Sequence, residues 1–145
     1  MTKPKVLISD KMDPNAARNF AERGCDVIIA SRKLENCEAV AEECRALGVR
    51  AMALSAHVGR WDACTELVDQ AWDAFGRVDI LVNNAAHQMH FDRFEDISDD
   101  EWDTTFRTNI HAMFYLSKAA VPLMKQGGAI INSASVNSDM PNPGL

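Results

Sequence analysis

The sequence lacks the features of a membrane-spanning or exported chain. It has no run of about 18 apolar residues, the length that a helix needs to cross a bilayer. Its amino terminus has no basic stretch followed by an apolar stretch, which a secretory signal requires. We therefore expect no membrane-spanning helix and no secretory signal.

Positive charge is also scarce. The chain holds 15 Lys and Arg against 21 Asp and Glu, for a formal net charge of −6. Nucleic acids and acidic membrane surfaces are bound by clustered Lys and Arg. The sequence therefore predicts neither a nucleic acid nor a membrane as partner.

The cysteines lack any C-x-x-C spacing. Four are present, at Cys25, Cys37, Cys44 and Cys64. Isolated cysteines of this kind are typical of reduced thiols packed in a protein interior. We expect reduced thiols and a cytoplasmic location, and we expect no metal site. His87-x-x-His90 has helical spacing for a ligand pair, but no third ligand accompanies it.

Glycine is missing from the loop after the first apolar run, where residues 9–16 read Ser-Asp-Lys-Met-Asp-Pro-Asn-Ala. Dinucleotides need glycines at such a turn, so that backbone N–H groups can approach the pyrophosphate. Asp10 and Asp13 would repel that anion, and Pro14 lacks an N–H. We expect a capped structural turn, with residual anion binding by Lys11 as the alternative.

What the sequence does contain is an alternation of strands and helices in a chain that is 47% hydrophobic. Short apolar runs typical of buried parallel strands lie at 6–8, 27–30, 51–54, 80–82 and 129–131. Four amphipathic stretches separate them. Three end at Gly24, Gly48 and Gly76, and the fourth starts with a Ser98-to-Glu101 capping box and ends near Gly127.

This pattern predicts one domain over residues 1–145 of the α/β class. We expect a doubly wound, three-layer Rossmann-like sandwich of five parallel strands, because right-handed crossovers between parallel strands favour it. We choose the strand order 3-2-1-4-5, with 2-1-3-4-5 as the alternative.

From about Val27 to Leu145 the chain resembles short-chain dehydrogenases/reductases, and four segments carry this resemblance. They are 28–33 (IIASRK), 75–85 (FGRVDILVNNA), 102–109 (WDTTFRTN) and 130–135 (IINSAS). The resemblance implies that Ser31 and Arg32 favour NADP over NAD, and that Asn83, Asn84 and Ala85 brace the cofactor. It also implies that Asn109 and Ser135 match catalytic residues, as remnants of a catalytic set.

Two parts of that family pattern are missing. The glycine loop is absent, and Leu145 is reached before a Tyr-x-x-x-Lys motif. Tyr115 is the single tyrosine, and Ala119 stands where the lysine would be. Without that proton donor, carbonyl reduction loses its general acid. We therefore expect a catalytically silent domain without a cofactor. The alternative is an NADP-dependent oxidoreductase for an alcohol or carbonyl, whose Tyr-x-x-x-Lys comes from a partner chain.

Residues 3–26 resemble another family, the D-3-phosphoglycerate dehydrogenases, through the opening KVLISDKMDPNAAR. In that family such a strand and helix belong to the substrate domain. We expect an engineered chimera with a junction near Val27, or alternatively a truncated or divergent natural chain. The helix starting near Ser98 is expected to carry a homodimer interface, as its counterpart does in short-chain dehydrogenases.

Overall fold

The computed structural model describes residues 3–9, 14–135 and 140, and its core is a five-stranded parallel sheet. The strands are β1 (Lys5–Ser9), β2 (Asp26–Ser31), β3 (Ala51–Ser55), β4 (Val78–Asn83) and β5 (Met124–Asn132). Their order is β3-β2-β1-β4-β5, which confirms the predicted order and excludes the alternative. The topological switch point therefore lies between β1 and β4.

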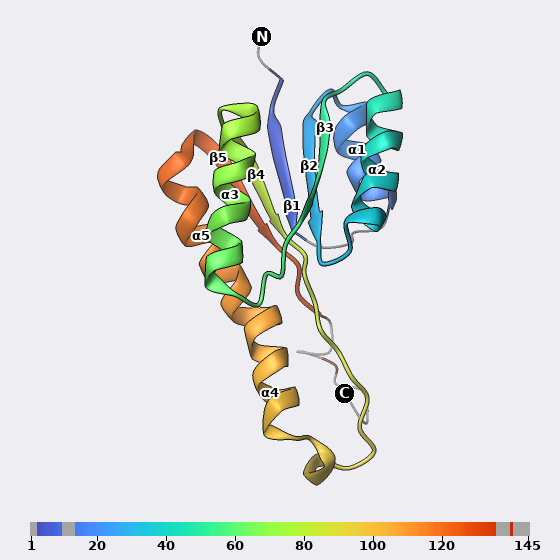
Figure 1. Ribbon diagram of the computed structural model, residues 1–145, viewed down its shortest axis with the longest axis vertical. Coiled ribbons are helices and arrows are strands. Elements are labelled where there is room, and N and C mark those ends of the chain that lie inside the picture. The colour runs from blue at the N-terminus through green and yellow to red at the C-terminus, as the bar shows by residue number, and fades with distance from the viewer. Residues whose placement is uncertain (1–2, 10–13, 136–139, 141–145) are drawn as a thin grey trace.

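Helices cover both faces of the sheet (Figure 1). α1 (Pro14–Glu22) and α2 (Leu34–Ala46) lie on one side, and α3 (Trp61–Phe75) and α5 (Ala112–Ala120) lie on the other. Each face of the sheet therefore has its own apolar core. One, under α3 and α5, includes Leu7, Leu81 and Leu116, and the other, under α1 and α2, includes Ile8 and Ala41. This is the predicted three-layer sandwich.

The fourth helical segment is longer and more irregular than a plain α-helix. It runs through α4 (Asp99–Phe106), a π-helical turn η2 (Arg107–His111), α5 and a 3₁₀ turn η3 (Val121–Leu123). A short 3₁₀ turn, η1 (Phe94–Asp96), precedes it. The α4 part projects beyond the sheet together with the long connection from β4 (Figure 1). The predicted end of the fourth helical segment near Gly127 is wrong, because β5 already begins at Met124.

Gly127 has a different role from the helix stop that we predicted. Its φ is +90°, in the region that favours glycine, and it lies inside β5. Val78 pairs with Met124 while Ile80 pairs with Ala129, so β5 carries extra residues opposite β4. Glycine in a strand often marks such a bulge. The glycine signal was therefore read correctly as a break but assigned to the wrong element.

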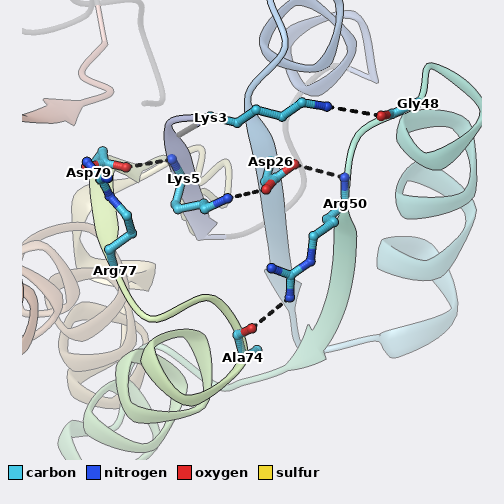
Figure 2. A network of polar contacts seen from close by, with 8 residues as sticks. All are labelled: Lys3, Lys5, Asp26, Gly48, Arg50, Ala74, Arg77 and Asp79. Atoms are coloured by element: carbon cyan, nitrogen blue, oxygen red, sulfur yellow. Dashed lines mark hydrogen bonds and ion pairs between the residues drawn. The ribbon is translucent and has the colours of Figure 1, made fainter. Parts of the chain in front are cut away.

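Polar contacts tie the amino-terminal ends of the strands together (Figure 2). Lys5 forms an ion pair with Asp26, and the side chains are only 11% and 3% exposed. Asp26 also accepts a hydrogen bond from the Arg50 backbone N–H at 2.9 Å. The Lys5 backbone N–H donates to Asp79 at 2.8 Å. One cluster thus connects β1, β2, β4 and the residue before β3, and it fixes β1 at the centre of the sheet.

None of the described helices is both long and apolar enough to cross a membrane. All four cysteines are reduced and buried, as expected for packed thiols. Burial raises the pKa of Cys64 to about 12, and it also raises the pKa of Cys25 and of Cys44. These groups therefore stay protonated near neutral pH, and they lack the thiolate that nucleophilic catalysis requires.

Candidate functional site

The carboxyl ends of the strands collect the polar residues that the sequence singled out. Buried polar side chains stand at the ends of β1, β2 and β4, namely Ser9, Ser31 and Asn83. In open α/β sheets this edge is where ligands bind, at the switch point between neighbouring strands. The residues named from the sequence therefore lie on the edge of the sheet where a ligand is expected.

Side-chain bonds fasten the end of β4 to the segment after β5. Asn83 Nδ2 donates to Asn132 Oδ1 at 2.8 Å, and Ser133 N donates to the Asn83 carbonyl at 2.9 Å. Ser133 Oγ donates to Asn84 Oδ1 at 2.8 Å. Asn83 Oδ1 is buried and has no hydrogen-bond partner among the described residues. Asn83 is thus held in a hydrogen-bonded turn that joins the end of β4 to the segment after β5.

Ser9 joins the same turn from β1. Its hydroxyl donates to the Val82 carbonyl at 3.1 Å and receives the Asn84 N–H at 3.3 Å. Our sequence reading gave no role to Ser9, Asn132 or Ser133. Their shared signal was a polar residue at the end of an apolar run, which indicates a ligand-facing edge. Ala85, which follows the turn, is buried.

Ser31 shapes the turn after β2 rather than presenting its hydroxyl. The Ser31 Oγ accepts the Lys33 N–H at 3.2 Å and the Cys37 thiol at 3.2 Å, and it donates to the Lys33 carbonyl at 3.1 Å. Arg32 is exposed as a result, and no hydrogen bond or ion pair of its guanidinium is found within the described ranges. Arg32 lines a small hollow of about 20 Å³, together with His57, His87 and Thr108.

Asn109 lies in the π-helical turn, and its side chain hydrogen-bonds to the backbone of one residue of the β4–α4 connection. Its Oδ1 accepts the His87 N–H at 2.7 Å, and its Nδ2 donates to the His87 carbonyl at 2.8 Å. π-helical turns often occur at functional sites. The side chain of Asn109 therefore binds the backbone of the β4–α4 connection.

Ser135 lies at the far end of a larger groove. This groove has a volume of about 1020 Å³ and runs between the β4–α4 connection, α4 and the residues after β5. Asn84, His87, Asn109 and Ser135 all line it. Asn109 and Ser135, the two residues matched to catalysis, are therefore brought to one cavity.

Other sequence hypotheses find less support. Asp10, Lys11 and Asp13 of the glycine-free loop lie outside the described residues. No group of three metal-ligating side chains occurs in the part of the chain that the structure describes, and His90 instead lies 3.4 Å from Asp92. Tyr115 packs edge to face on Trp61, with ring centroids 5.4 Å apart, as a packing residue does.

Comparison with known proteins places this architecture in a family. The profile described as "short chain dehydrogenase" matches residues 14–145, so the match begins within residues 3–26 and crosses Val27. An uncharacterised oxidoreductase of Schizosaccharomyces pombe is 36% identical over 132 residues, which cover 90% of this chain and 46% of that protein. The chain spans about half the length of the curated relatives that it matches.

Solved structures agree in fold. A doubly substituted short-chain dehydrogenase/reductase of Serratia marcescens superposes with a TM-score of 0.89 and 29% identity, covering 98% of this chain and 59% of its own. A blue fluorescent protein from a metagenomic library, solved with NADPH, gives 0.88 and 26%, covering 98% and 60%.

These findings correct the functional prediction. We expected a catalytically silent domain, and that expectation is wrong; the expectation of no cofactor is not supported. The relatives include proteins named as oxidoreductases, and structural neighbours hold NADPH or NAD, so the comparisons point to an oxidoreductase. The functional prediction was wrong because it gave more weight to the missing glycines and the missing Tyr-x-x-x-Lys motif than to the four family segments. The chain belongs to the short-chain dehydrogenase/reductase family.

Proposed function

We propose that this chain carries the cofactor site of an NADP-dependent oxidoreductase that acts on an alcohol or a carbonyl compound. Arg32 binds the adenosine 2′-phosphate, Ser31 shapes the turn that presents it, and Asn83 and Ala85 brace the middle of the site. NADPH, when bound, supplies the hydride for carbonyl reduction. The protein residues provide binding, orientation and proton transfer.

The observation that carries this proposal is the exposed guanidinium of Arg32 at the carboxyl end of β2. An acid at this position would favour NAD through the ribose hydroxyl, whereas an arginine accommodates the extra phosphate of NADP. Lys33 is also exposed and adds a second positive charge. Arg32 has no acidic partner within the described residues that a phosphate would have to displace. Arg32 and Lys33 therefore fit the 2′-phosphate of the cofactor.

The catalytic assignment is part of the same proposal. Ser135 orients the substrate carbonyl, and Asn109 helps to hold a relay water near the same groove. Neither residue supplies a proton donor of suitable pKa. The site therefore needs a proton donor besides Asn109 and Ser135.

Removing the Arg32 charge tests the cofactor site. We expect Arg32→Ala to weaken NADPH binding by about 10- to 100-fold, because a hydrogen bond to a charged group contributes about 1.5–3 kcal/mol. Titration by NADPH fluorescence measures the effect, with NADH in parallel. Arg23→Ala is the matched control, since Arg23 is exposed in the turn that precedes β2, at the amino-terminal edge of the sheet. Equal NADPH affinity in wild type and Arg32→Ala would show that this site is not used.

We also propose a homodimer that forms through α4 and α5. Large apolar side chains are exposed along this segment, at Trp102, Phe106, Ile110, Phe114 and Val121. Their spacing of four to seven residues lines them along the helical segment, and such a patch indicates an interface.

A charge in this surface should break the dimer. Phe114 is 60% exposed, and we expect Phe114→Glu to raise the dimer dissociation constant at least about 30-fold, the effect of a binding hot spot. Sedimentation equilibrium measures the constant. Leu47→Glu is the control because Leu47 is exposed at the end of α2, on the opposite side of the sheet from α5. A wild-type chain that stays monomeric at high concentration would contradict the interface.

The first strand and helix, residues 3–26, are proposed to have a separate origin from the rest. Their support is the glycine-free sequence of residues 9–16 and the resemblance to D-3-phosphoglycerate dehydrogenases. We propose an engineered junction within a compatible βα framework. A natural protein carrying the whole sequence would contradict this origin.

A further inference from the structure

A single residue ties the β4–α4 connection to the long helical segment. Asn109 holds both backbone polar groups of His87, at 2.7 and 2.8 Å. The ring of the same residue meets α4, where His87 Nε2 lies 2.6 Å from Glu101 Oε1. His87 is therefore fixed at three points, two on its backbone and one on its ring.

Glu101 does not follow the capping-box pattern that the sequence predicts. In a capping box the carboxylate returns to the backbone N–H of the N-cap residue. Here Ser98 Oγ does accept the Glu101 N–H at 3.1 Å, but the Glu101 carboxylate meets the His87 ring. The two side chains are 23% and 22% exposed, so little water competes for this contact. Glu101 therefore contacts the β4–α4 connection with its side chain and the N-cap of its own helix with its backbone.

His87 also lies between the two hollows at the carboxyl edge of the sheet. It lines the small hollow that contains Arg32, and it lines the groove that contains Ser135. An NADP molecule with its 2′-phosphate at Arg32 and its reactive ring near Ser135 has to pass His87. The orientation of the ring then decides what the cofactor meets there.

We infer that His87 is a cofactor-positioning residue and that Glu101 sets the orientation of its ring. When Nε2 donates to Glu101, the Nδ1 atom of a neutral imidazole carries a lone pair and can only accept. An acceptor suits a sugar hydroxyl of the cofactor rather than a phosphate oxygen. This inference rests on the proposed function and adds the contact that holds the middle of the cofactor.

Two ligands of different length separate positioning from general structural damage. NADPH spans both hollows, whereas adenosine 2′-monophosphate reaches only the Arg32 end. We expect His87→Ala and Glu101→Ala each to weaken NADPH binding about tenfold, the effect of one good hydrogen bond. Both variants should weaken the binding of adenosine 2′-monophosphate less than that of NADPH, because His87 lies at the border between the two hollows. Calorimetric titration of the whole chain measures both affinities.

Conservative and control variants sharpen the result. Glu101→Gln keeps an acceptor for the His87 ring, so NADPH binding should stay within about threefold of wild type. His90→Ala is the matched control, because the His90 ring is exposed and its one ion-pair partner within the described residues is Asp92. The double variant of His87 and Glu101 should be no weaker than either single variant, since they act as one unit.

The outcomes distinguish this inference from the proposed function. A wild type that binds NADPH, with variants that bind it equally well, would overturn the role of His87. Equal weakening of NADPH and adenosine 2′-monophosphate would also overturn it, because that result shows a structural role only. A wild type that binds neither ligand would contradict the proposed function, and the inference would fall with it.

Discussion

Lys5→Met is expected to destabilise the chain by about 3–5 kcal/mol, because it leaves the buried Asp26 carboxylate without its ion-pair partner. The Asp26 side chain is 3% exposed, so water cannot replace the lost ammonium. The Arg50 N–H would be the one hydrogen bond left to Asp26 among those found in the described structure (Figure 2). Urea unfolding, followed by circular dichroism, measures the loss.

The free energy of unfolding should respond to acidification in opposite directions in the wild type and in Lys5→Met. Burial pushes the pKa of Asp26 up, but hydrogen bonds from Lys5 and the Arg50 amide and the Lys5 charge outweigh burial and lower it. A lowered pKa contributes stability above the unfolded-state value of about 3.9, and that stability is lost as pH falls through the folded-state value. In Lys5→Met burial dominates, so acidification should instead relieve part of the defect.

An exposed pair provides the control for Lys5. Arg60 pairs with Asp62, and each side chain is well exposed to solvent. Such pairs contribute about 0–1 kcal/mol, so Arg60→Met should leave the free energy of unfolding nearly unchanged. A Lys5→Met loss as small as the Arg60→Met loss would show that β1 is not fixed by this ion pair.

Leu7→Ala is expected to destabilise the chain by about 2–5 kcal/mol, because it opens a cavity in the centre of the sheet. Leu7 is fully buried in β1 and belongs to the same core as Leu81 and Leu116. Leu47→Ala is the control, since the side chain of Leu47 is exposed. Thermal unfolding of both variants measures the difference. Equal unfolding midpoints would mean that residues 5–9 do not occupy the central strand position.

The sheet could be predicted because its signals are local and repeated. Buried apolar runs separated by amphipathic stretches indicate parallel strands with crossover helices, and crossover handedness leaves few strand orders. The end of the fourth helical segment could not be predicted. Gly127 is a strand bulge, and only the pairing of β5 with β4 distinguishes a bulge from a helix stop.

The site could be predicted only in its parts. The family segments located Arg32, Asn83, Asn109 and Ser135, and all four lie at the carboxyl edge of the sheet or in the cavities beside it. Contacts between residues that are far apart in the chain could not be predicted from the sequence. The meeting of Glu101 with His87 depends on how a projecting helix packs against a loop, and local patterns instead predicted a capping box.

The central claim is that this chain forms an NADP site, and thermal unfolding with and without millimolar NADPH tests it most directly. A ligand at about 100 times its dissociation constant adds about 2.7 kcal/mol of stability. For a domain of this size the midpoint should rise on the order of 5–10 °C. We predict that rise with NADPH and a smaller one with NADH. A cooperative transition that NADPH leaves unmoved would contradict the account.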